Sequence, residues 1–138
     1  MMTPNEIFEF LNKNPFFFLA TSYENKPYVR GMMLHQTTRN EIIFTTTKVG
    51  DLYKHLKMNP SVELCFSDKK LQIRISGTAE EIRDKPELKI EIADARPFMK
   101  PWIEKAGYKP IAVFMLLNPF AVTWTRETSF EPKEYIQL

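Results

Sequence analysis

The feature that most constrains the fold is a succession of short segments rich in β-branched and aromatic residues, separated by turn residues. It predicts six or seven strands, at residues 16–22, 27–38, 41–47, 62–66, 71–80, 111–117 and 120–125. Strands that follow one another through short turns pair antiparallel, which favours a closed antiparallel barrel over an open parallel sheet. With 138 residues, the chain fits a single domain, residues 1–138, of mainly β (α+β) class.

Three expectations about strand pairing follow from this pattern. Residues 16–22 are almost continuously apolar, which predicts a strand buried on both faces. The Arg39–Asn40 turn predicts a hairpin between the second and third strands, which places Arg30 opposite Val49. The link through residues 51–58 is not a hairpin, so we expect a Greek-key-like crossover there.

Helical segments flank the predicted strands. The first begins with a capping box at Thr3–Glu6 and ends at Asn14–Pro15. A second is predicted for residues 51–58. A third, residues 86–105, is broken by its prolines, and we expect it to cover part of a pocket or of a dimer edge.

Composition excludes several classes of protein. Nineteen basic and 17 acidic residues give a net charge of +2, too small to argue for nucleic acid. A single cysteine, Cys65, excludes an internal disulfide and a cysteine-cluster metal site. No apolar stretch approaches the roughly 18 residues of a membrane span, and the N-terminus lacks the pattern of a signal peptide. We therefore expect a cytoplasmic protein that binds neither a membrane, nucleic acid nor a metal.

Basic residues gather between Lys26 and Lys57, where six basic residues accompany two acidic ones. A helix that begins at Asp51 offers free backbone N–H groups and a partial positive charge, and threonines 45–47 precede it. Lys54 falls near the first turn of this helix, where the dipole disfavours a cation unless an anion neutralises it. The segment fits either a phosphate pocket or solvated surface charge, and the spacing alone does not decide between them.

No other motif indicates catalysis. His35 and His55 lack metal-ligand spacing, Cys65 alternates with apolar strand residues, and four glycines cannot supply a glycine-rich phosphate loop. Gln72 fits the polar face of a half-buried strand, and Trp124 fits core or interface packing. A bound cofactor that brings its own reactivity suits such a chain.

Several fragments, in this order and spacing, resemble a known family. They are Pro27-x-x-Arg30, the threonine-rich strand end that leads into Asp51-Leu52-Tyr53-Lys54, Leu56-x-x-Asn59-Pro60 and Gln72-x-Arg74-x-x-Gly77. Over roughly residues 5–126, the chain resembles the pyridoxamine 5'-phosphate oxidase-like family of FMN-binding split barrels. The resemblance implies a six- or seven-stranded antiparallel split barrel that forms a homodimer, with two FMN sites at the subunit interface.

The resemblance also implies which residues hold FMN. They are Arg30, Gly31, Met32, Thr46, Thr47, Lys48, Gly50, Lys54, Gln72 and Trp124. The first three match the strand that runs along the flavin, and the residues from Thr46 to Lys54 match the phosphate side. Gln72 matches a glutamine that approaches the flavin from the partner chain, and Trp124 matches an aromatic residue over the cofactor.

Two departures from the family pattern bear on function. Many relatives carry Lys or Ser near the position of Gly50, whereas here Lys48 lies two residues earlier. The C-terminal SFEPKEYIQL has no counterpart of the arginine-bearing motif of the vitamin-making oxidases, so pyridoxamine phosphate is not the expected substrate. We expect an FMN-dependent oxidoreductase of an unidentified small molecule, with NAD(P)H as one candidate reductant. A non-catalytic flavin-binding or storage module, and a split barrel that binds deazaflavin or haem, remain alternatives.

Overall fold

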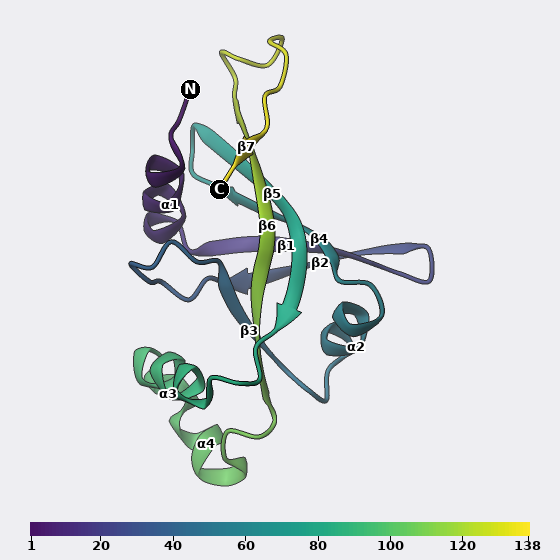
Figure 1. Cartoon of the computed structure of the whole chain (residues 1–138), viewed down its shortest axis with the longest axis vertical. Helices are drawn as coiled ribbons and strands as arrows, with labels where there is room; N and C mark the ends of the chain where they lie inside the picture. The colour runs from purple at the N-terminus through teal and green to yellow at the C-terminus, as the bar shows by residue number, and fades with distance from the viewer.

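The computed structural model describes residues 1–138, which form one antiparallel sheet flanked by helices (Figure 1). The strands are β1 (Phe16–Tyr23), β2 (Lys26–Met33), β3 (Ile43–Thr47), β4 (Ser61–Ser67), β5 (Leu71–Glu81), β6 (Ile111–Thr125) and β7 (Ile136–Gln137). The helices are α1 (Pro4–Lys13), α2 (Asp51–Met58), α3 (Pro86–Ala95) and α4 (Lys100–Ala106), with a short 3₁₀ turn, η1 (Pro97–Met99), between the last two.

The sheet has the hydrogen-bonded order β2-β1-β4-β5-β6-β3, and β7 pairs with β6. Its end strands, β2 and β3, do not pair with each other, so the sheet is not closed, unlike the closed barrel that strand counting favoured. The split-barrel class, with seven antiparallel strands and flanking helices, is confirmed. The crossover expected at α2 is also present, because α2 connects β3 at the sheet edge to β4 in its interior.

The predicted hairpin between β2 and β3 is wrong. Arg30 pairs with Leu19 of β1 rather than with Val49, because β2 folds back on β1. β2 ends at Met33, earlier than predicted, since the chain turns away there and buries Leu34 in the core. β3 then begins two residues later than predicted and pairs with β6.

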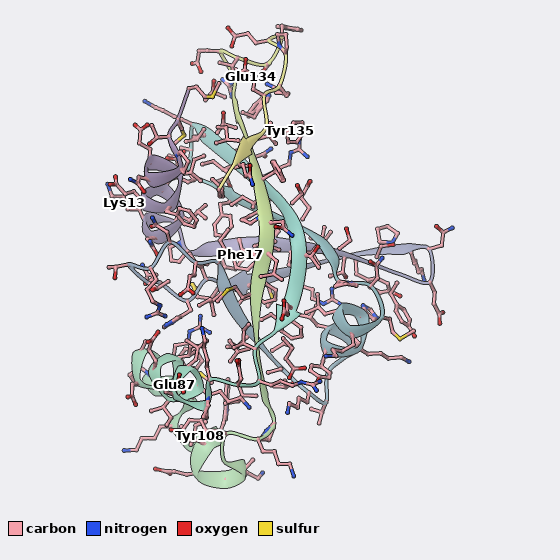
Figure 2. All side chains as sticks on the ribbon, in the orientation of Figure 1. Lys13, Phe17, Glu87, Tyr108, Glu134 and Tyr135 are labelled. Atoms are coloured by element: carbon pink, nitrogen blue, oxygen red, sulfur yellow. The ribbon has the colours of Figure 1, made fainter.

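β1 is not buried on both faces as predicted. Phe17 and Leu19 are fully buried, whereas Phe16 and Phe18 are about half exposed, at 52% and 50%. Successive strand side chains point to opposite faces, so one half of the apolar run fills the core and the other half faces outward. Figure 2 shows Phe17 near the centre of the molecule, crossed by the long strands.

The last two predicted strands are one continuous strand, β6. Asn118 has a positive φ of 51° and precedes Pro119, yet the strand continues through this step. The register of β5 and β6 shifts here between Ser76 and Thr78, which forms a β-bulge. Gly77 lies in this bulge, and a Cβ there would come within 2.8 Å of both the Leu116 side chain and a backbone carbonyl oxygen of β6. The close approach of the two strands therefore requires glycine.

The helices form largely as the sequence predicts. Thr3 caps α1 through Oγ1, which accepts from the Glu6 backbone N–H at 3.2 Å, and Glu6 returns the capping-box bond. α2 has the predicted bounds, and the late helical stretch divides at Pro97. Pro101, predicted to be a second break, instead lies in the first turn of α4, where proline is tolerated.

The buried residues form two clusters. A cluster of 20 residues lies between the sheet, α1 and α2, and a smaller cluster of six joins α3 and η1 to β3 and β6. Figure 1 shows α3 and α4 together at one end of the molecule, away from the C-terminal loop that follows β6. None of the helices is long and apolar enough to cross a membrane.

Candidate functional site

Arg30 is the most enclosed cation at the predicted phosphate side. It lies on the core-facing side of β2, because its cross-strand partner Leu19 is fully buried. Its guanidinium donates from Nη1 to Thr21 Oγ1 at 2.9 Å and from Nη2 to His55 Nδ1 at 3.0 Å. Arginine only donates, so His55 Nδ1 accepts here and the imidazole hydrogen is on Nε2. The Arg30 side chain is only 19% exposed.

Aromatic rings surround this arginine. The His55 ring stacks on Tyr23, with centroids 4.4 Å apart, and lies 4.5 Å from Tyr28. The Arg30 guanidinium carbon lies 5.7 Å from the Tyr28 centroid. Lys54 Nζ lies 5.4 Å from the Tyr23 ring, and a hydrogen bond with Tyr23 raises the pKa of the lysine. The structure therefore directs the charge of Lys54 toward the β1–β2 hairpin.

The start of α2 lies beside Arg30. Gly50 is the N-cap and has no side chain to satisfy the first backbone N–H groups of the helix. Asp51, the first helical residue, places Oδ1 3.7 Å from Arg30 Nη2, and its side chain is 73% exposed. A Cβ built on Gly50 would lie 3.4 Å from Thr47 Oγ1, so that hydroxyl is close by. Three predicted site residues, Arg30, Gly50 and Thr47, thus gather at this helix start.

The hydrogen-bond donors gathered at this helix start suit a phosphate group. An uncapped helix start and a desolvated guanidinium are both anion-binding features, and the Thr47 hydroxyl can donate a further hydrogen bond. Asp51 is the one negatively charged side chain among these groups. The Asp51 side chain is largely exposed, so packing against the core does not fix its position.

The structure separates other predicted residues from this group. Thr46 shares the core face of β3 with Phe44, since both cross-strand partners belong to the main cluster. Lys48 lies near Lys89 of α3: burial lowers the pKa of Lys89 and the charge of Lys48 lowers it further. Lys48 therefore adds positive charge beside α3.

Gly31 and Met32 lie on opposite faces of β2. Met32 packs against the main core cluster. Gly31 faces outward, where a Cβ would come within 2.8 Å of the Phe16 ring. The Phe16 ring therefore lies directly against the Gly31 backbone on the outward face.

Gln72 and Trp124 are direct cross-strand neighbours at the β5–β6 pair. Gln72 lies on the outer face, because its neighbour Ile73 is buried in the core. Arg30 lies on the inner face of the same sheet, so a single chain does not assemble these two parts of the predicted site. The outer face also carries a group of exposed apolar side chains. These are Phe16, Phe18, Val29, Met33, Phe120 and Trp124, which we call the outer apolar face.

Arg96 is a partly buried cation without a carboxylate partner. It follows α3 and donates from Nη2 to the Met33 carbonyl oxygen at 3.0 Å and from Nη1 to Thr45 Oγ1 at 3.4 Å. Burial lowers its pKa, and no acidic group offsets that effect. The predicted late helical segment therefore reaches the end of β2 and the middle of β3 through this residue and brings an unneutralised positive charge there.

An ion network fixes α2 on the sheet. Glu81, at the end of β5, accepts from Tyr53 Oη at 2.7 Å, from Lys57 Nζ at 3.1 Å and from Arg83. Burial alone would raise the pKa of Glu81, but these hydrogen bonds outweigh it and hold the pKa at about 2. Tyr53 and Lys57 are one helical turn apart, so Glu81 holds one side of α2.

Both histidines are engaged in contacts within the protein. His55 accepts from Arg30, and the buried His35 contacts Glu91 of α3 through Nε2. Arg39 and His35 together lower the pKa of Glu91 to about 2. These contacts give both histidines structural roles. The sequence did not identify Thr21 as a partner of Arg30, and nothing in the local pattern marks that threonine.

Comparison with known proteins identifies the family. Residues 3–123 match the family model described as pyridoxamine 5'-phosphate oxidase. The chain belongs to this family. The resemblance inferred from the sequence fragments is therefore confirmed over most of the chain. Comparison with curated proteins gives no match.

Solved structures share the fold of this family member at low sequence identity. A NimC/NimA family protein from Clostridium acetobutylicum is 22% identical with a TM-score of 0.79, over 97% of this chain and 92% of that chain. A heme binding protein from Mycobacterium smegmatis is 13% identical, with a TM-score of 0.73, over 99% of this chain and 59% of that one. An FAD-binding protein from Mesorhizobium loti is 17% identical, with a TM-score of 0.65, over 88% and 94%. The fold thus occurs in proteins described as flavin-binding and as haem-binding.

Proposed function

We propose that this chain is an FMN-binding flavoprotein, an oxidoreductase that acts on an unidentified small molecule other than pyridoxamine phosphate. The observation that carries the proposal is the enclosed guanidinium of Arg30 beside the uncapped start of α2, in a member of the pyridoxamine 5'-phosphate oxidase family. Such a pairing of a desolvated cation with free backbone N–H groups favours a phosphate.

The residues of this chain would hold FMN in two ways. Arg30, the α2 backbone and Thr47 would bind the phosphate, while β2, the strand that the family resemblance places along the flavin, would run beside the ring. When bound, the flavin supplies the capacity to accept and return reducing equivalents, with NAD(P)H as the proposed reductant. Arg96 would place a positive charge near the end of β2, suited to an anionic part of a ligand.

The proposal includes a homodimer. In one chain, Gln72 and Trp124 lie on the sheet face opposite to Arg30, so they can meet the flavin only of a second copy. The outer apolar face supports this arrangement, because half-exposed Phe16 and Phe18 side chains are typical of a surface that another protein covers. The partner's Gln72 and the partner's Trp124 would complete each site.

Haem is a weaker candidate than flavin for this chain. An axial histidine needs a ring nitrogen that is free to bind iron. The buried His35 contacts Glu91 through Nε2, and His55 accepts from Arg30 at Nδ1, which keeps the hydrogen on its Nε2. A Soret band in the purified protein would contradict this ranking.

The site assignment is tested by FMN titration of a double variant, Arg30→Ala with Lys54→Ala. We expect FMN affinity to fall about tenfold or more, or about 1.4 kcal/mol. The control removes two exposed cations elsewhere, Arg126→Ala with Lys105→Ala, and should leave affinity unchanged. Equal affinity in the double variant and the wild type would refute the assignment. Reduction by NADPH, followed by reoxidation with a panel of acceptors, separates an oxidoreductase from a flavin-storage module.

A further inference from the structure

An acidic side chain lies where the phosphate of FMN is expected. Asp51 is the first residue of α2, and its Oδ1 is 3.7 Å from Arg30 Nη2. Both Nη atoms of Arg30 also have hydrogen-bond partners within the protein, Thr21 and His55. The guanidinium therefore already donates hydrogen bonds within the protein before a ligand binds.

The charges around this point make Asp51 a competitor for a ligand anion. A carboxylate in the first turn of a helix is stabilised by the helix dipole, as a phosphate would be. Lys54, which could offset a second negative charge, is directed toward the Tyr23 ring. A dianionic phosphate that approaches Arg30 must therefore displace the Asp51 carboxylate or lie beside it.

We propose that Asp51 determines the specificity of this site by weakening its preference for a phosphorylated flavin. The inference rests on the proposed function, since it concerns the same phosphate site. The uncharged ribityl end of riboflavin meets no such repulsion, because it carries hydroxyl groups that Asp51 can accept from. The wild-type site thus holds FMN as an exchangeable ligand and discriminates little between FMN and riboflavin.

The test compares FMN and riboflavin binding to the wild type and to Asp51→Asn, by quenching of flavin fluorescence at low ionic strength. We expect the two wild-type affinities to lie within about tenfold of each other. Asp51→Asn should strengthen FMN binding at least about tenfold and leave riboflavin binding unchanged. Because Asp51 is largely exposed, the variant should keep its fold, which its thermal midpoint verifies.

A matched control separates a local effect from net charge. Glu127→Gln makes the same change in charge in the exposed C-terminal loop, which lies away from α2 (Figure 1). It should leave both affinities unchanged. An Asp51→Asn variant that binds FMN no more tightly than the wild type, or that strengthens both flavins equally, would overturn the proposal. Failure of every variant and the wild type to bind either flavin would instead overturn the proposed function.

Discussion

Replacing Glu81 by Gln removes the negative charge at the centre of the ion network that holds α2 on the sheet. The Glu81 side chain is only 4% exposed and accepts from Tyr53, Lys57 and Arg83. Lowering its pKa from the ordinary 4.5 to about 2 corresponds to about 3 kcal/mol of stability at neutral pH. We therefore expect Glu81→Gln to reduce the free energy of unfolding by about 3 kcal/mol at pH 7.

The contribution of Glu81 to the free energy of unfolding should decrease as the pH falls. A carboxyl whose folded pKa is depressed contributes stability above its unfolded pKa of 4.5, and the contribution disappears as the pH falls through about 2. At pH 3 the loss caused by the Glu81→Gln substitution should therefore shrink to about 1 kcal/mol. Urea unfolding of both proteins at the two pH values measures the difference.

The neighbouring Glu80 provides the control, because it is exposed and makes no ion pair. Glu80→Gln should change the free energy of unfolding by no more than about 0.5 kcal/mol at either pH. If Glu81→Gln cost the same at pH 3 as at pH 7, packing rather than charge would explain the loss. A cost no larger than that of Glu80→Gln would show that the Glu81 network does not stabilise the fold.

Three further predictions address the fold and the dimer. Gly77→Ala forces a Cβ to within 2.8 Å of β6 and should cost about 1–3 kcal/mol of stability by urea unfolding, more than Gly50→Ala, whose nearest contact is 3.4 Å. Phe18→Asp should convert the proposed homodimer to a monomer in sedimentation, whereas Phe130→Asp, in the C-terminal loop, should not. Glu91→Gln should cost about 1 kcal/mol at pH 7, because the carboxylate is 43% exposed, and less as the pH falls below 4.5.

Each of these has an outcome that contradicts it. Equal stability of the two glycine variants would mean that the β5–β6 bulge relaxes at no cost. A dimer that survives Phe18→Asp would place the subunit contact elsewhere. A Glu91→Gln cost that stays constant down to pH 3 would show that its ion pairs with Arg39 and His35 contribute nothing.

Local features of the fold could be predicted from the sequence because local interactions decide them. The Thr3–Glu6 capping box sets the start of α1, and α2 has the bounds that its sequence predicts. The alternation of Ile73 and Ile75 with polar residues correctly oriented β5. In each case the determining contacts lie within a few residues of one another.

Strand pairing across the Arg39–Asn40 turn could not be predicted in the same way. The Arg39–Asn40 turn exists, with Asn40 at φ 56°, yet the strands on either side of it lie at opposite ends of the sheet order. A turn residue determines a local reversal of the chain, whereas the pairing partner depends on which surfaces can be buried together. For the same reason, the apolar run at Phe16 and Phe18 could not reveal which side chains face outward.

The candidate site was predicted partly for the wrong geometric reason. Arg30 was expected beside the start of α2 through a hairpin with β3, but it arrives there because α2 packs against β1, with which β2 is paired. The role now proposed for Asp51 has no signature in the sequence, since an acidic residue is ordinary in a first helical turn. Only its 3.7 Å approach to Arg30 distinguishes it.

Whether this chain binds FMN can be measured on the purified protein. The absorption spectrum of the freshly purified protein would be recorded, and the flavin-free form would then be titrated with FMN. We expect flavin absorption bands or saturable binding of about one FMN per chain. A folded protein that shows neither would contradict the claim and leave only the split-barrel fold.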